Sequence, residues 1–196
     1  MKENLRTTHY ANGTSIPLGD DVSMKKPYRY YPDNNSSNVS TYGYLYNWPA
    51  VMHGENASSS NPSGVQGICP NGWHVPSESE WTQMTTYVSS QQKYVCGNRK
   101  ASDIAKSLAS TKGWKGADET CTIGNNPSAN NATGFTFHPS GEYCGKYYFF
   151  GKEAFLWTTT VEYGSVITPE FIYDYTWVYD NNRDKYYGLS VRCLRN

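Results

Sequence analysis

The stretch from residue 67 to residue 81 constrains the fold more than any other part of this chain. Two pairs of turn-forming residues lead into a short apolar run, which a proline ends. Ser77 and Glu80 follow at the spacing of a capping box, in which each side chain binds a free backbone N–H at the start of a helix. We therefore expect a strand, a sharp turn and a helix in direct succession. Three side chains of this stretch should be buried: Trp73, His74 and Trp81.

Helical patterns occupy the first half of the chain and strand patterns the second half. The spacing of apolar residues predicts helices over residues 42–51, 77–89 and 101–109. Residues 112–133 have the composition of a long loop. Strands are predicted where short aromatic and apolar runs alternate with glycines, at 135–137, 147–150, 154–160, 171–179 and 189–194. This segregation predicts an α+β fold, formed by a single domain over residues 1–196.

The composition limits the partners that the domain can have. Aromatic residues make up 15% of the chain, with 18 Tyr and 6 Trp, so a core is feasible although only 37% of the residues are hydrophobic. The 17 basic and 17 acidic residues cancel, and no basic cluster stands out, which argues against nucleic acid as a partner. The chain contains no apolar run near the roughly 20 residues of a transmembrane segment.

The cysteines and histidines give no metal-binding pattern. The five cysteines contain no Cys-x-x-Cys pair and none lies at zinc spacing from a histidine, so we expect no metal site of that kind. A composition rich in Tyr, Asn, Ser and Gly with scattered cysteines favours an oxidising compartment. The first residues lack the apolar stretch of a signal peptide, so the chain is either cytosolic or cut from a longer exported protein. The composition favours the second interpretation.

Three blocks of sequence together resemble the Fibrobacter succinogenes major paralogous domain family, which is common in Bacteroidetes. They are Lys-Glu-Asn-Leu-Arg-Thr-Thr with Tyr-Ala-Asn-Gly-Thr (2–8 and 10–14), Thr-Tyr-Gly-Tyr-Leu-Tyr-Asn-Trp with the stretch above (41–48 and 69–81), and Gly-Leu-Ser-Val-Arg-Cys-Leu-Arg (188–195). The middle block is also similar to the Gly-Trp-Arg-Leu-Pro-Thr-Glu-Ala-Glu-Trp stretch of formylglycine-generating-enzyme-like domains. The resemblance implies a C-type-lectin-like fold, with two main helices on a small, twisted, mostly antiparallel sheet, long loops and neighbouring termini. It also implies an exported, usually surface-attached bacterial protein.

In such a fold, Cys69 and Cys193 could bridge the ends of the sheet. Cys96 and Cys121 flank the third predicted helix and could form a second disulfide, which leaves Cys144 unpaired. Other pairings, and free buried thiols, stay open. A catalytic thiol at Cys144 or Cys193 would need the paired reactive cysteines of formylglycine-generating enzymes, and only one cysteine lies in the last predicted strand.

The strongest functional signal is the aromatic and polar stretch over residues 157–187. Between Phe171 and Tyr179 every odd position is aromatic, so in a strand these side chains would share one face. That face is either core or a recognition surface for a glycan or a protein, because Tyr and Trp give a large contact area at low entropic cost. The candidate ligand-binding residues are Trp157, Tyr163, Tyr173, Tyr175, Trp177, Tyr179, Asp180, Asn181, Asn182, Tyr186 and Tyr187.

Calcium is the one cofactor that the sequence leaves open, because many lectin-type domains hold sugar through it. Oxygen donors gather in the same region, at Asp174, Asp180, Asn181, Asn182 and Asp184. Turn chemistry explains these residues equally well, and the chain lacks the Glu-Pro-Asn and Trp-Asn-Asp motifs of calcium-dependent sugar binding. We therefore expect no obligatory cofactor.

The sequence thus predicts a non-enzymatic ligand-binding or adhesion module, located outside the cell or on the bacterial surface. Relatives of the family also serve as variable proteins of diversity-generating retroelements, and the corresponding window here is residues 162–187. Two alternatives stay open: an oxidoreductase of the formylglycine-generating type, and a purely structural surface module.

Overall fold

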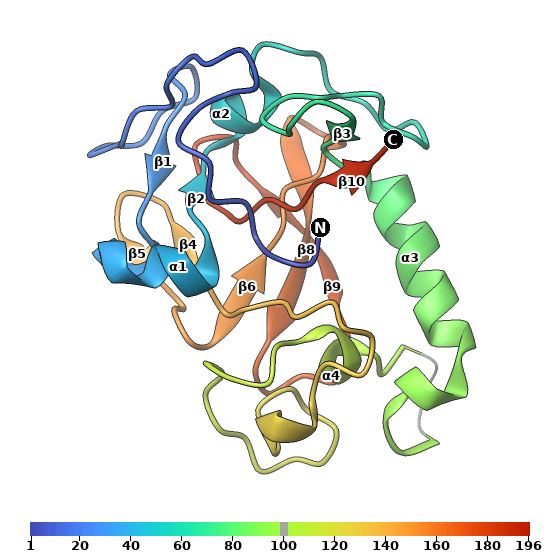
Figure 1. Ribbon diagram of the computed structural model, residues 1–196. Helices are drawn as coiled ribbons and strands as arrows, with labels where there is room; N and C mark the ends of the chain where they lie inside the picture. The colour runs from blue at the N-terminus through green and yellow to red at the C-terminus, as the bar shows by residue number, and fades with distance from the viewer. Residues whose placement is uncertain (99–101) are drawn as a thin grey trace.

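The computed structural model describes residues 1–98 and 102–196, which form a mixed α and β domain (Figure 1). Its helices are short except for one, and its strands form several small antiparallel sheets. The α-helices are α1 (Val39–Tyr42), α2 (Trp48–Met52), α3 (Glu78–Ser90) and α4 (Ala105–Leu108). The strands are β1 (Arg29–Tyr30), β2 (Leu45–Tyr46), β3 (Trp73–His74), β4 (Glu142–Tyr143), β5 (Tyr147–Tyr148), β6 (Glu153–Phe155), β7 (Val161–Glu162), β8 (Ser165–Ile172), β9 (Tyr179–Arg183) and β10 (Leu194–Arg195).

The stretch around the capping box folds as the sequence predicts. The Ser77 side chain accepts a hydrogen bond from the backbone N–H of Glu80, and the Glu80 carboxylate accepts one from the backbone N–H of Ser77. Helix α3 begins at the next residue and runs for 13 residues. His74 and Trp81 are buried as expected, whereas Trp73 is only partly buried.

The helix predicted over residues 42–51 is wrong. Residues 39–52 instead form α1, β2 and α2 in succession. Gly43 ends α1 with a φ of 75°, and a side chain there would meet the Leu5 carbonyl oxygen at 2.6 Å. Asn47 then caps α2, and Pro49 occupies the first turn, where it needs no N–H donor. Helix α3 is therefore the one main helix in the described part of the chain, and the expected pair of main helices is not found.

The third predicted helix is shorter than expected. Residue 101 lies outside the described residues, and the helix that follows it, α4, spans only residues 105–108. The strand predicted at 135–137 is reduced to an isolated bridge between Phe137 and Ala109. In the strand predicted at 189–194, only Leu194 lies in a strand, β10, while Leu189 and Ser190 form isolated bridges.

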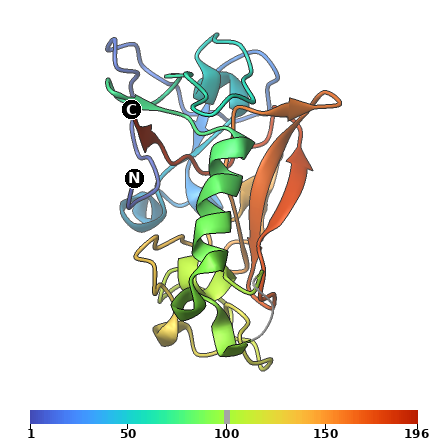
Figure 2. The same cartoon turned by 90° about the vertical axis from the view of Figure 1, so that its right-hand side faces the viewer.

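The largest sheet is built on strand β8. Glu170 pairs with Phe155 of β6 and Tyr179 of β9, and Val166 pairs with β7 and β9, so β6 and β7 share one edge of β8 and β9 takes the other. Pro169 lies between the β6 and β7 segments, where the ladder requires no N–H donor. Figure 2 shows α3 running beside the long β8–β9 hairpin.

Three clusters of buried side chains form the core of the described residues, and the smallest contains Tyr30, Leu45 and Tyr143. The first contains Trp157, Tyr46 and Phe155 together with both sulfurs of Cys69 and Cys193. The second lies under α3 and contains Trp81, Phe137 and Phe171, whose rings contact one another at an angle.

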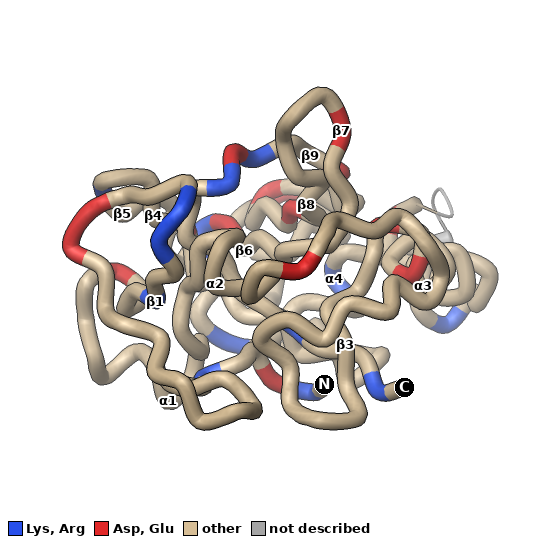
Figure 3. The backbone as a smooth tube through the Cα atoms, turned by 90° about the horizontal axis from the view of Figure 1, so that it is seen from above, with Lys and Arg blue, Asp and Glu red and all other residues tan. Residues whose placement is uncertain are grey.

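The two termini are neighbours, as predicted. The α-ammonium group of Met1 donates a hydrogen bond to the Cys193 carbonyl at 2.7 Å, and both ends lie on the same side of the molecule in Figure 1. Basic and acidic residues are interspersed along the chain (Figure 3). No helix in the described residues has both the length and the apolar character needed to cross a membrane.

Candidate functional site

Two disulfides hold the fold, and both are the predicted ones. Cys69, before β3, is joined to Cys193, before β10, and Cys96 is joined to Cys121. Cys144 is free and partly buried. Burial and the nearby Glu142 carboxylate raise the pKa of the Cys144 thiol, which keeps it protonated rather than activated.

The aromatic segment from Phe171 to Tyr179 is not one strand, which corrects the sequence prediction. Strand β8 ends at Ile172, and residues 173–178 form an irregular turn before β9. Backbone hydrogen bonds from the loop at residues 123–124 hold this turn. The N–H group of Gly124 donates to the Tyr173 carbonyl, and that of Ile123 donates to the Tyr175 carbonyl. Phe171 is fully buried, so the alternating aromatics do not share one face.

The turn instead brings three aromatic side chains into contact at one end of the hairpin. Tyr175, Trp177 and Tyr179, which we call the aromatic triad, have ring centroids 5.1 to 5.4 Å apart. The Trp177 side chain is exposed, with 37% of its surface accessible, and the two tyrosines are partly buried. The sequence predicted these three residues as candidates, and the structure places them together by a turn rather than by strand alternation.

Tyr173 lies beside the triad in sequence but has a different partner. Its hydroxyl accepts a hydrogen bond from the Lys115 ammonium at 2.9 Å, and that ammonium also lies 4.5 Å from the centre of its ring. The side chain of Asp174, the next residue, is exposed. Polar and charged groups therefore lie beside the triad in the chain.

Trp157 does not belong to any exposed surface, which corrects its assignment as a ligand-binding residue. It has no accessible surface, and its indole N–H donates to the Tyr46 carbonyl at 2.6 Å. An indole that is packed in the core with its one donor satisfied has a structural role.

The remaining candidates lie along β9 and at the opposite end of the hairpin. Asp180, Asn181 and Asn182 are in strand β9, so Asn181 faces one side of the sheet while Asp180 and Asn182 face the other. Tyr163 is fully exposed in the turn between β7 and β8, and the rings of Tyr186 and Tyr187 contact each other at an angle after β9. The triad lies at the turn that joins β8 to β9, whereas these tyrosines flank the other end of the paired strands, so the predicted surface is divided into two.

The oxygen donors considered for calcium do not converge. The amide of Asn181 donates to the Glu170 carboxylate at 2.5 Å, and Asp184 accepts a hydrogen bond from Ser165 at 3.2 Å. Asp180 and Asn182 lie on the other side of the strand from Asn181. Within the described residues, no group of three or more His, Cys, Asp or Glu side chains is placed to hold a metal ion.

Sequence reasoning missed a buried charged cluster beneath the hairpin. Arg183 on β9 contacts Glu142 on β4 at 2.9 Å and Glu170 on β8 at 3.6 Å, and its guanidinium also lies over the Phe155 ring. Glu153 on β6 hydrogen-bonds to Glu170. Burial and the neighbouring carboxylates of Glu170 and Glu142 raise the pKa of Glu153 to about 7. Glu153, Glu170 and Arg183 meet through the strand register of the largest sheet, whereas Glu142 comes from the separate β4–β5 hairpin.

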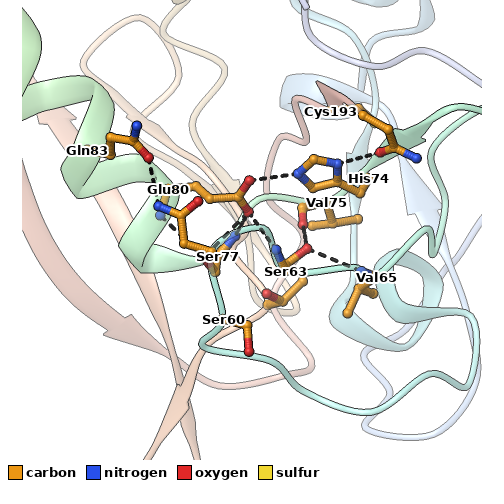
Figure 4. Close-up of polar contacts among 12 residues, drawn as sticks. Ser60, Ser63, Val65, His74, Val75, Ser77, Glu80, Gln83 and Cys193 are labelled. Atoms are coloured by element: carbon orange, nitrogen blue, oxygen red, sulfur yellow. Dashed lines mark hydrogen bonds and ion pairs between the residues drawn. The ribbon is translucent and has the colours of Figure 1, made fainter.

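A second buried polar network stabilises the stretch around the capping box (Figure 4). One oxygen of Glu80 accepts hydrogen bonds from the N–H groups of Ser63 and Ser77, both at 3.0 Å, and the other contacts the His74 ring at 2.7 Å. The second ring nitrogen of His74 contacts the side-chain oxygen of Asn196 at 2.6 Å. His74 is thus a structural hydrogen-bonding residue, as its position in the sequence predicts.

Two hollows of the described surface lie away from the triad. These hollows, of about 360 and 380 Å³, flank Ala11 and Asn71, between the hairpin at residues 8–16 and the loop at residues 66–71. No residue of the triad lines either hollow, and its exposed residue, Trp177, is open to a ligand that packs on it from outside.

The fold and the site together define a disulfide-linked α+β module with an aromatic surface at the end of a β-hairpin. The chain belongs to the Fibrobacter succinogenes major domain family, whose sequence profile matches residues 1–195. A search of curated proteins found no match to the chain, and a search of solved structures found none either.

Proposed function

We propose that this chain is a non-enzymatic, exported bacterial ligand-binding module of C-type-lectin-like fold, which recognises a glycan or a protein through the aromatic triad. The observation that carries the proposal is the exposed Trp177 ring, held against Tyr175 and Tyr179. An exposed Trp loses contact with water when a ligand covers it, and aromatic residues are enriched among the side chains that dominate binding energy.

The way the triad is held also supports this proposal. Gly124 and Ile123 bind the backbone on either side of Asp174, and the N–H of Ala105 donates to the Thr176 carbonyl at 3.1 Å. The Thr176 hydroxyl donates to the Asp103 carboxylate at 2.6 Å. A surface fixed in this way loses little conformational entropy on binding, which favours affinity.

The geometry of the rings favours stacking over enclosure. Centroid separations of 5.1 to 5.4 Å mean that the rings touch one another and fill the space between them. A ligand would therefore lie on the outer face of Trp177, as the apolar face of a sugar ring or a side chain of a partner protein would do. Lys115 and Asp174 would supply polar contacts at the edge of this surface.

The two disulfides support a location outside the cell or on its surface, because such bonds persist in oxidising compartments. The oxidoreductase alternative needs two reactive thiols. Four of the five cysteines are joined in disulfides, and burial raises the pKa of the fifth, Cys144. The ligand-binding proposal is therefore preferred over a formylglycine-generating activity and over a purely structural role.

Retroelement diversification is a second element of the proposal. The window from residue 162 to residue 187 contains exposed positions such as Tyr163 and Trp177, but also the buried Val166 and Phe171. We therefore expect variable positions, if the gene is diversified, to fall in the turn at residues 173–178 and beyond it. A reverse transcriptase gene and a near-identical template repeat beside this gene would support the idea, and their absence would rule it out.

The function is tested by screening the purified domain against glycan and protein arrays, alongside the variant Trp177→Ala. The matched control is Tyr148→Ala, which removes an exposed aromatic ring from the β4–β5 hairpin. We expect the parent and the control to bind the same ligands and Trp177→Ala to lose them. Equal binding by all three proteins would refute the role of the triad.

A further inference from the structure

The side chains of Glu153 and Glu170 lie close together on paired strands of the largest sheet. They lie on the same face of the sheet, because Glu153 pairs with Ile172, two residues from Glu170 on β8. Burial, the charges of Glu170 and Glu142 and a hydrogen bond with Glu170 raise the pKa of Glu153, so Glu153 keeps its proton to higher pH than an exposed glutamate does. Two carboxylates this close cannot both ionise without strong repulsion.

The charges around this pair do not balance once the proton leaves. Arg183 from β9 contacts both Glu170 and Glu142, the latter from β4, so one guanidinium serves three carboxyl groups. Arg183 favours ionisation of Glu153, whereas burial, Glu170 and Glu142 oppose it more strongly. Loss of the proton therefore leaves an additional uncompensated charge in the sheet.

This charge lies directly beneath the aromatic triad. Tyr179 is the cross-strand partner of Glu170, so their side chains are neighbours on the same face. Tyr175 hydrogen-bonds to Tyr179, and the Glu153 carboxylate contributes to raising the pKa of Tyr175, after the larger effect of Tyr179. The pairing of Glu170 with Tyr179 thus joins the carboxyl pair to the triad.

We propose that the Glu153–Glu170 pair is a proton latch, which holds the triad end of the β8–β9 hairpin in its binding arrangement when protonated and loosens it when ionised. The groups that face the latch are Glu142 from β4, Arg183 and Asn181 from β9, and Tyr175 from the turn. The consequence for binding rests on the proposed function, and it predicts weaker binding in mildly alkaline than in mildly acidic solution.

The latch is tested without any ligand, by ¹⁹F NMR of the folded protein labelled with fluorotryptophan. The variant Trp177→Phe assigns the Trp177 resonance, which is then followed from about pH 5 to about pH 9. We expect this resonance to move with a midpoint near pH 7, following the Glu153 carboxyl group. The same midpoint should appear in the control Glu162→Gln, which changes a carboxylate on the exposed end of β7.

In Glu153→Gln the movement should disappear, because the amide keeps a donor toward Glu170 but cannot ionise in this range. An unchanged titration in Glu153→Gln, or no titration in the parent, would overturn the latch. Should the variant not fold, ¹³C NMR of the glutamate carboxyl carbons in the parent decides: one group titrating near pH 7 supports the latch, and none refutes it. Failure of the array experiment would refute the proposed function and leave this result standing.

Discussion

The disulfide between Cys69 and Cys193 should stabilise the domain more than the disulfide between Cys96 and Cys121. The first joins residues 124 positions apart and the second joins residues 25 apart. In the chain-entropy model, closing these loops in the unfolded state is worth about 5 and about 3.5 kcal/mol respectively. Replacing each pair by alanines should therefore lower the free energy of unfolding by amounts that differ by about 1.4 kcal/mol.

Urea denaturation followed by tryptophan fluorescence, without reductant, measures both losses directly. Cys144→Ala is the control, since this thiol is unpaired and partly buried, and it should change the free energy of unfolding by less than about 1 kcal/mol. Cys69 and Cys193 are also packed in the core, so replacing them with alanine removes packing contacts and lowers the free energy of unfolding further. An equal or larger loss for the Cys96 and Cys121 pair would refute the reasoning from loop length.

Three further predictions concern buried polar groups, and urea denaturation measures each. Glu80→Ala should cost about 3–5 kcal/mol, because it leaves the N–H groups of Ser63 and Ser77 and the His74 ring without their buried acceptor; a loss under 1 kcal/mol would contradict the network. Tyr46→Phe should lower the free energy of unfolding by about 1 kcal/mol, because the Tyr46 hydroxyl donates to the Thr7 carbonyl at 2.7 Å. Tyr10→Phe should leave it unchanged, because the Tyr10 hydroxyl has no hydrogen-bond partner in the described residues. A larger loss of stability for Tyr10→Phe than for Tyr46→Phe would contradict this reasoning. Glu153 binds its proton more tightly in the folded protein than in the unfolded chain, so the folded protein should lose stability as the pH rises. After allowing for solvent screening, the free energy of unfolding should fall by about 1–2 kcal/mol between pH 4.5 and about pH 7 and then level off. Glu153→Gln should not show this fall.

Local chemistry explains why part of the fold could be predicted from sequence. The capping box of Ser77 and Glu80 needs only residues three positions apart, so helix α3 starts where the sequence indicates. The Cys69–Cys193 disulfide was expected from the fold that the family resemblance implies, and the Cys96–Cys121 disulfide from the positions of its cysteines on either side of the third predicted helix. These features do not depend on the details of tertiary packing.

The predictions that fail depend on contacts between distant segments. The apolar spacing over residues 42–51 resembles a helix, but close approach of the Leu5 carbonyl to Gly43 breaks it. The alternation from Phe171 to Tyr179 is typical of a strand, but the loop at residues 123–124 pairs with the backbone and turns it. Periodicity within a window cannot register such partners.

The candidate site was predicted in part for the same reason. The triad residues were named, but their contact arises from a turn that the sequence pattern did not reveal. Trp157 was assigned to the surface because composition does not distinguish a buried indole from an exposed one. The sequence pattern does not reveal the cluster of Glu142, Glu170 and Arg183, because the pairing of β8 with β9 and the packing of the separate β4–β5 hairpin bring together residues 13 to 41 positions apart.

The most direct test of the proposed function compares the parent with Trp177→Ala. It measures the affinity of each protein for the ligand identified by the arrays, together with the thermal unfolding of each. We predict at least about 30-fold weaker binding by the variant, equivalent to about 2 kcal/mol for a dominant tryptophan contact, with thermal unfolding close to that of the parent. Binding within about threefold of the parent, by a variant that remains folded, would contradict recognition through the triad.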